Sequence, residues 1–145
     1  MGKRGFQYND GTCHIGMSAR SKAEADAAAS GEAWVSVSLD GGLIDEEGNA
    51  TDIAKKVSDF VEEGWKIAVT SSRSSDQKEE VKQILEKIGV ASNVQQIHLT
   101  ESQAKGSYFR DKGFHPVFHI DRKQSELDGM PDTTRGIHVS QLQTD

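Results

Sequence analysis

The chain has 145 residues, a length that a single domain commonly occupies. Its net charge of −6, with 34% hydrophobic and 28% charged residues, is typical of a soluble globular protein and argues against a broad nucleic-acid-binding surface. A single cysteine, Cys13, excludes an internal disulfide framework and favours a reducing compartment. No apolar run approaches the ~18 residues of a membrane span, and none follows the first residues as in a signal peptide, so we expect a cytoplasmic protein without a membrane partner.

Residues 1–32 are expected to form an extension that precedes a main domain at residues 33–145. Residues 5–17 predict a β-hairpin, because the Asn9-Asp10-Gly11 segment tolerates positive φ between two strand-like arms. The alanine-rich segment at 21–30 predicts a short helix that ends at Gly31. Such an extension can lengthen the sheet edge, cover a site or contact a second subunit; our hypothesis is a homodimer contact.

From residue 33 onward, strand and helix patterns alternate with short links. Strands are predicted at 33–39, 65–70, 96–99, 116–120 and 136–139. Helices are predicted at 51–63, from about 74 to 88, and from about 100 to 112, with a polar loop or short helix after residue 120. Two pairs, Ser74 with Gln77 and Thr100 with Gln103, have the spacing of capping boxes. This alternation predicts a three-layer α/β, Rossmann-like domain with a five-stranded, mainly parallel sheet.

Polar residues follow each predicted strand. Asp40-Gly41-Gly42 comes after the first strand, Ser71-Ser72-Arg73 after the second and Asp121-Arg122 after the fourth, while Lys105 stands early in the helix after the third. In parallel sheets ligands bind beyond the carboxyl ends of the strands, so we expect these residues to meet at one edge. Hydroxyls, a lysine and carboxylates together are suited to phosphate and Mg²⁺.

These motifs resemble, in the same order, those of the haloacid dehalogenase-like (HAD) superfamily of phosphatases and phosphotransferases, over roughly residues 33–140. The first motif corresponds to Ser38-Leu39-Asp40-Gly41-Gly42 and the second to Ser71, with Thr70 as the alternative. The third corresponds to Lys105 and the fourth to Asp121-Arg122. The resemblance implies a sheet of order 5-4-1-2-3, which places the first and fourth strands side by side.

The resemblance also implies roles. Asp40 takes the place of the family's general acid and base, Ser71 and Lys105 complete the catalytic set, and Asp40 and Asp121 are the candidate metal ligands. Phosphate contacts are expected from residues at the strand ends, including two of the catalytic candidates. The candidate phosphate-binding residues are Ser38, Gly41, Gly42, Ser71, Ser72, Arg73, Lys105 and Arg122.

Three positions depart from the family pattern. Ser38 stands where the family has its nucleophilic aspartate, and serine is a weak nucleophile without an adjacent base. Gly42 replaces a threonine, and Arg122 replaces the second acid of the fourth motif. Because Mg²⁺ is held mainly by negative charge, we expect weak Mg²⁺ binding or none, and direct binding of an anion by Arg73, Lys105 and Arg122.

Three functions follow as hypotheses. The first is a HAD-like protein with a degenerate site that binds a phosphorylated small molecule, a nucleotide or a partner protein. The second is an active Mg²⁺-dependent phosphatase or nucleotidase in which Asp40 or Asp45 has a new role. The third is a structural interaction module.

The five histidines show no spacing typical of a zinc site. His98 and His119 fall inside predicted strands, where we expect them to be packed and hydrogen-bonded. His119 stands two residues before Asp121, which directs it toward the same edge of the sheet.

Overall fold

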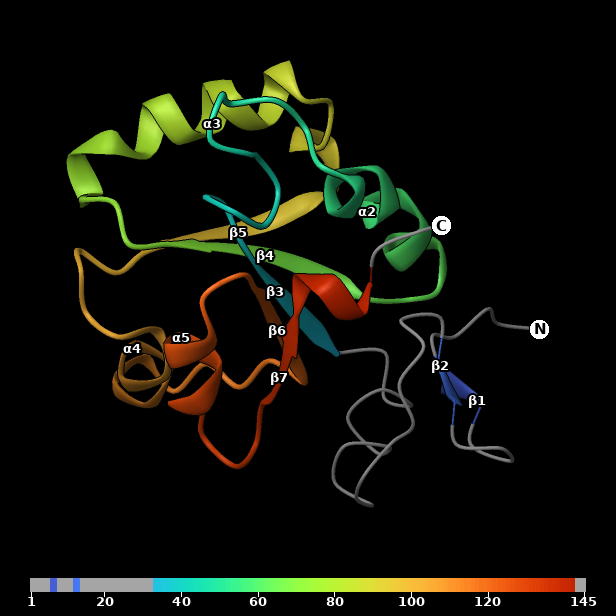
Figure 1. The fold of residues 1–145 in the computed structure, drawn as a ribbon, viewed down its shortest axis with the longest axis vertical. Helices are drawn as coiled ribbons and strands as arrows, with labels where there is room; N and C mark the ends of the chain where they lie inside the picture. Colours follow the sequence, from blue (N-terminus) through green and yellow to red (C-terminus); the bar gives the residue numbers. More distant parts are fainter. Residues whose placement is uncertain (1–5, 8–11, 14–32, 143–145) are drawn as a thin grey trace.

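A computed structural model describes residues 6–7, 12–13 and 33–142 of the chain. Its centre is a five-stranded sheet in which every strand pairs in parallel with its neighbours, in the order β5-β4-β3-β6-β7 (Figure 1). The strands are β3 (Trp34–Ser38), β4 (Lys66–Ser71), β5 (Val94–Leu99), β6 (Phe118–Asp121) and β7 (Arg135–His138). Counted from β3, this is the order 5-4-1-2-3 expected above, and the predicted α/β class is confirmed.

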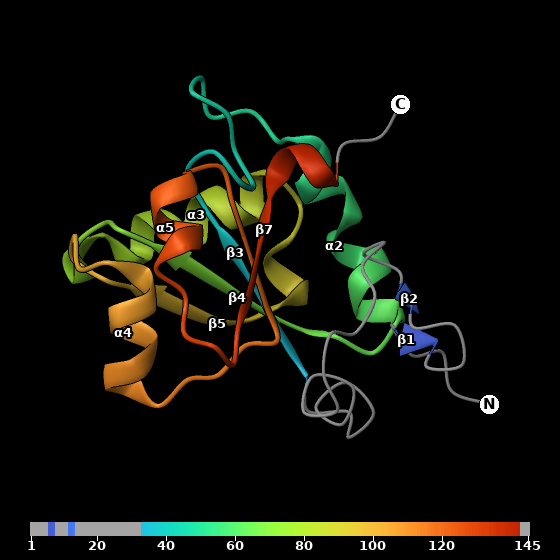
Figure 2. The same ribbon diagram turned by 60° about the horizontal axis from the view of Figure 1, so that its bottom comes forward.

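Helices cover both faces of the sheet. On one side lie α2 (Asp52–Glu62) and α3 (Lys78–Lys87), and on the other lie α4 (Lys105–Lys112) and α5 (Gln124–Asp128) (Figures 1 and 2). Short 3₁₀ turns at Ser75–Gln77, Ala91–Asn93 and Val139–Gln141 complete the connections. The result is the predicted three-layer arrangement, because a parallel sheet needs a helix in each crossover.

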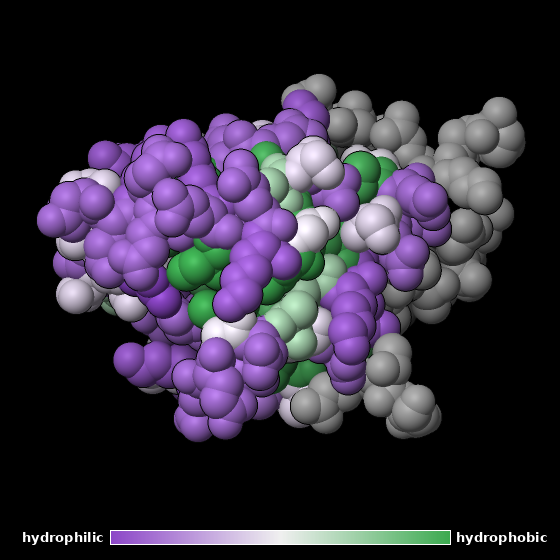
Figure 3. Space-filling view, turned by 90° about the horizontal axis from the view of Figure 1, so that it is seen from above, coloured by the Kyte–Doolittle hydropathy of each residue, from purple (hydrophilic) through white to green (hydrophobic). Residues whose placement is uncertain are grey.

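The hydrophobic core lies between the sheet and the α2/α3 layer. Alternate residues of the strands point toward it and are fully buried, among them Val35, Val37, Ile67, Val69 and Ile120. Each of the two helices packs an apolar stripe with helical spacing against this face of the sheet. The stripe consists of Ile53, Val57 and Phe60 in α2 and of Val81 and Leu85 in α3. Seen from the top of Figure 1, the molecule is largely hydrophilic with a strip of hydrophobic atoms through its middle (Figure 3).

The opposite face of the same strands is polar. Ser36 and Ser38 in β3, Thr70 in β4, and His119 and Asp121 in β6 alternate with the apolar residues, and all five are buried. Period-two alternation therefore separates an apolar face under α2 and α3 from a polar face on the other side of the sheet. This polar face leads to the carboxyl edge of the sheet.

Most predicted element boundaries agree with the structure. The Ser74–Gln77 capping box is present, with the backbone N–H of Ser74 donating to Gln77 Oε1 at 3.1 Å. The capping box predicted at Thr100 and Gln103 is wrong, because α4 begins at Lys105 with Ala104 as its N-cap. Glu101 and Ser102 adopt positive φ angles of 54° and 70°, and a right-handed helix cannot pass through them.

In the N-terminal part, β1 (Phe6–Gln7) pairs antiparallel with β2 (Thr12–Cys13), as the predicted hairpin requires. The helix expected at 21–30 lies outside the described residues, and the homodimer contact expected of residues 1–32, most of which also lie outside them, stays a prediction. Among the helices that the structure describes, none combines the length and the apolar character that crossing a membrane requires.

Candidate functional site

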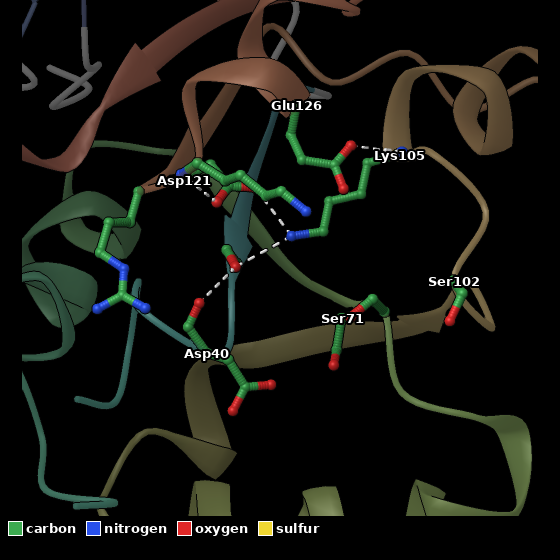
Figure 4. Close-up of a pocket in the computed structure, with 10 residues that line it drawn as sticks. Asp40, Ser71, Ser102, Lys105, Asp121 and Glu126 are labelled. Atoms are coloured by element: carbon green, nitrogen blue, oxygen red, sulfur yellow. Dashed lines mark hydrogen bonds and ion pairs between the residues drawn. The ribbon is translucent and has the colours of Figure 1, made fainter. Parts of the chain in front are cut away.

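A polar cavity of about 520 Å³ opens at the carboxyl edge of the sheet (Figure 4). Residues from β3, β4 and β6, from the loops that follow these strands and β5, and from α4 and α5 converge on it. Every residue that lines it is polar or charged: Ser38, Asp40, Ser71, Ser72, Ser102, Lys105, Asp121, Arg122, Lys123 and Glu126. These segments meet because parallel strands end at the same edge and the chain turns there toward the next helix.

A buried ion pair forms one part of the cavity wall. The Lys105 ammonium donates to Asp121 Oδ2 at 2.8 Å and to Ser38 Oγ at 3.0 Å, and the two charged side chains are only 6% and 2% exposed. Figure 4 shows Lys105 reaching from the start of α4 across to the ends of β3 and β6. The other oxygen of Asp121, Oδ1, accepts the backbone N–H of Lys123 at 3.0 Å. Ion pair and hydrogen bonds together satisfy a carboxylate that would otherwise be costly to bury.

Behind Asp121, a chain of hydrogen bonds runs across the sheet. His119 Nε2 lies 2.9 Å from Asp121 Oδ2, His119 Nδ1 lies 2.9 Å from Ser36 Oγ, and Ser36 Oγ lies 2.7 Å from Thr70 Oγ1. Burial lowers the pKa of His119, against the opposing effect of Asp121, so the imidazole is neutral at neutral pH. Burial would raise the pKa of Asp121, but the hydrogen bond from His119 and the charge of Lys105 outweigh it and hold that pKa well below its usual range.

At the outer rim, Asp40 is paired with Arg73. Arg73 Nε donates to Asp40 Oδ2 at 3.2 Å and Nη2 donates to Oδ1 at 3.0 Å, a two-pronged contact, and Nη1 contacts Glu80 at 3.3 Å. The backbone carbonyl of Asp40 accepts from the Ser38 hydroxyl at 3.1 Å. In Figure 4 the Asp40 carboxylate points away from Lys105 and Asp121. Its carboxylate is therefore engaged in an ion pair at the surface, separate from the buried pair.

Hydroxyl groups line the side of the cavity formed by the β4 and β5 loops. Ser71 is buried and its Oγ accepts the backbone N–H of Arg73 at 3.2 Å, which leaves its own proton available for a ligand. Ser102 lies in the loop after β5. Its backbone N–H donates to the Ser72 carbonyl at 2.9 Å and so connects this loop to the loop after β4. Thr70, the alternative to Ser71, points into the sheet toward Ser36 and does not line the cavity.

Most of the residues predicted from sequence do come together. The cavity contains seven of them, which are Ser38, Asp40, Ser71, Ser72, Lys105, Asp121 and Arg122. Gly41, Gly42 and Arg73 do not line it. Gly42 instead permits a close backbone approach, since a Cβ there would lie 2.1 Å from the Ser38 carbonyl oxygen. Asp45 closes its own turn, its Oδ1 accepting the N–H groups of Glu47 and Asn49.

Sequence reasoning did not identify Ser102, Lys123 and Glu126 as part of the site. Glu126 reaches from α5 to accept the backbone N–H of Lys105 at 3.0 Å, and so holds the first residue of α4. The hydrogen-bonded chain behind Asp121 could have been predicted from sequence, because polar side chains stand at alternate positions of β3, β4 and β6. Of that chain, only His119, two residues before Asp121, is predicted from sequence to point toward this edge of the sheet.

The donor set does not fit Mg²⁺. Asp121 already accepts from Lys105, His119 and a backbone N–H, Asp40 is paired with Arg73, and Ser38 supplies no negative charge. Within residues 33–142 and the two short N-terminal strands, no three acidic, histidine or cysteine side chains are grouped so as to hold a metal ion. The cation that contacts the candidate metal ligand Asp121 is the Lys105 ammonium, which also donates to Ser38.

Comparisons with known proteins return no relative: no family model, no curated protein and no solved structure matches this chain.

Proposed function

We propose that the cavity binds the phosphate group of a small molecule and does not transfer it, in a protein that resembles a HAD phosphatase with a degenerate site. The observation that carries this proposal is the contact of the Lys105 ammonium with both Ser38 Oγ and Asp121 Oδ2. It joins three of the four motif positions in one pocket and leaves none of them chemically activated. The sheet order and the motif order support the resemblance.

Anion binding follows from the charges that remain after internal pairing. Lys105 is balanced by Asp121, and Asp40 is balanced by Arg73. Among the described residues, Arg122 has only a distant contact to Glu46 at 3.8 Å, and no carboxylate pairs with Lys123. The lining side chains alone carry three positive and three negative charges, so the anion site depends on the two cations without a close ion pair, Arg122 and Lys123, and on hydroxyls from Ser71, Ser72 and Ser102 as neutral donors for phosphoryl oxygens.

Phosphoryl transfer would require an activated nucleophile. Ser38 needs a base, and its nitrogen neighbour, Lys105, is an ammonium in an ion pair and has no lone pair to accept a proton. His119 Nε2 faces Asp121, not Ser38. Without a base for Ser38 and without carboxylates free for a metal, the site is suited to binding.

Two assays test the proposal. Thermal unfolding with inorganic phosphate, with a small phosphate ester and with chloride at matched ionic strength should show a rise in Tm with the two phosphate ligands only, since a ligand of the native state stabilises it. Arg122→Ala and Lys123→Ala should weaken the response, while Lys82→Ala, on α3, is the charge-matched control. Hydrolysis of p-nitrophenyl phosphate should be absent with and without Mg²⁺.

Each alternative predicts a different result. Mg²⁺-dependent release of p-nitrophenol that requires Asp40 would identify an active phosphatase and refute the binding-only function. A Tm that responds equally to phosphate and chloride would indicate a structural module without an anion site.

A further inference from the structure

The hydrogen-bonded chain through His119 lies inside the sheet, away from the cavity surface. Ser36, Thr70 and His119 are each fully buried, and none of them lines the cavity. They come from three neighbouring strands, because β3 lies between β4 and β6 and Ser36 pairs directly with His119 in the β3/β6 register. The chain ends at Asp121, whose Oδ2 also receives Lys105.

The chemistry of the acceptor determines the direction of each hydrogen bond. An ionised Asp121 carboxylate can only accept, so His119 Nε2 carries the proton and donates it. The other nitrogen of the neutral ring, Nδ1, therefore accepts from the Ser36 hydroxyl. The ring of Phe109 packs edge-on against the imidazole at a centroid distance of 5.6 Å. Both nitrogens are thus engaged and an aromatic ring packs against the imidazole, so the imidazole has one orientation.

We propose that His119 is a positioning residue of the phosphate site, acting through Asp121 on the Lys105 ammonium. This inference rests on the function proposed above. Oδ2 of Asp121 receives both His119 and Lys105, at 2.9 and 2.8 Å, so the imidazole sets where that oxygen lies and hence where the ammonium lies beside Ser38. Without the imidazole N–H, Oδ1 of Asp121 is still held by the Lys123 backbone, but Oδ2 keeps only its contact with Lys105, so the position of the ammonium is less firmly fixed.

Two substitutions at one position separate positioning from simple packing. The amide nitrogen of glutamine extends about as far as Nε2 and can still donate to Asp121, whereas that of asparagine corresponds to Nδ1 and reaches only Ser36. Titration calorimetry with inorganic phosphate should show His119→Gln retaining most of the affinity, within about threefold, and His119→Asn losing about tenfold, as expected for loss of a charge-assisted hydrogen bond.

A matched control separates stability from affinity. Thr134 does not line the cavity, and its buried hydroxyl donates a hydrogen bond of 2.7 Å to the Pro116 carbonyl. Thr134→Val removes this hydrogen bond. It should lower Tm and leave phosphate affinity unchanged. Equal phosphate affinity in the Gln and Asn variants would overturn the positioning role.

If His119→Asn does not fold, a measurement on the native protein still tests the positioning role. In ¹⁵N NMR of the imidazole, the Nε2–H signal should shift as phosphate is added to saturation, because the ligand changes the Lys105–Asp121 contact. An unchanged signal at saturation would overturn the inference while leaving the binding function in place. Failure of the native protein to bind phosphate at all would refute the proposed function itself.

Discussion

Lys105 Nζ lies 2.8 Å from Asp121 Oδ2, and this ion pair joins the first residue of α4 to the last residue of β6 in the interior of the protein. Lys105 is predicted from sequence as a helix residue of the site, and the structure buries its side chain almost completely. The contact therefore contributes both to the cavity and to the packing of α4 against the sheet.

Lys105→Met should lower the free energy of unfolding by about 3–5 kcal/mol, because it leaves the buried Asp121 carboxylate without its countercharge. The double variant Lys105→Met with Asp121→Asn should recover much of that loss. Urea denaturation of the two single variants and the double variant measures the coupling. A double variant as unstable as the sum of the two single variants would show that the ion pair does not couple the residues.

Stability should fall as the pH is lowered from 7 to 5, and His119 should cause part of this fall. Burial depresses the pKa of His119 below 6.5, so the unfolded chain binds a proton that the folded protein excludes. The stabilisation is complete above the unfolded pKa and is lost as pH decreases toward the folded pKa, by at most about 1.4 kcal/mol per pH unit. Urea denaturation at pH 7, 6 and 5 should show a shallower decline for His119→Gln.

Two other groups define the controls for this pH dependence. Burial also lowers the pKa of His98, so His98→Gln should remove a separate part of the decline. Asp121, whose pKa is depressed from 3.8, should contribute only below about pH 5, where the unfolded carboxylate begins to protonate. A decline between pH 7 and 5 that is the same in both histidine variants and in the native protein would contradict the assignment.

Gly42→Ala should be strongly destabilising, by about 3 kcal/mol or more, because overpacking against backbone cannot be relieved by a side-chain movement. The added methyl group would lie 2.1 Å from the Ser38 carbonyl oxygen. Gly129→Ala is the matched control, since its nearest contact would be 3.7 Å and its φ of −90° suits any residue. Chemical denaturation compares the two. Similar small losses in both variants would show that the β3 turn can relax.

Ser102→Gly should stabilise the protein by up to about 1 kcal/mol, because serine at a φ of 70° bears the cost of the left-handed region. Ser107→Gly, inside α4, should instead destabilise by about 0.5–1 kcal/mol, because it lowers helix propensity and removes the hydroxyl that accepts from Gln103 Nε2 at 3.0 Å. Thermal unfolding distinguishes the two signs. If Ser102→Gly also weakens phosphate binding, the Ser102 hydroxyl contacts the ligand.

The double variant Ser38→Asp with Arg122→Asp should gain Mg²⁺ binding, seen as a Mg²⁺-dependent rise in Tm that the native protein lacks. It adds two carboxylates to a cavity that contains Asp121 and removes one guanidinium, which supplies the hard oxygen ligands that Mg²⁺ prefers. Ser38→Asn with Arg122→Asn has nearly the same size and no added negative charge, and should show no response. Equal responses from the two double variants would mean that charge does not limit metal binding here.

Several elements could be predicted because their signals are local. The apolar stripes of α2 and α3 repeat with helical spacing, and the Ser74–Gln77 capping box needs only residues three apart. The start of α4 was predicted too early because the positive φ angles of Glu101 and Ser102 come from tertiary contacts. The Glu101 side chain accepts from Ser75, and its backbone N–H donates to the Arg73 carbonyl.

By itself, the sequence determined the alternation of strands and helices, and with it the common edge at which Ser38, Ser71 and Asp121 meet, since strands joined by crossover helices run parallel and end together. Only the tertiary structure decided which charges are paired there. Asp40 binds Arg73 and Asp121 binds Lys105, although the second of these pairs joins residues on different layers of the fold. Hydrogen bonds of about 3 Å depend on strand register and on where each helix begins. Neither of these two features can be read from the spacing of residues along the chain.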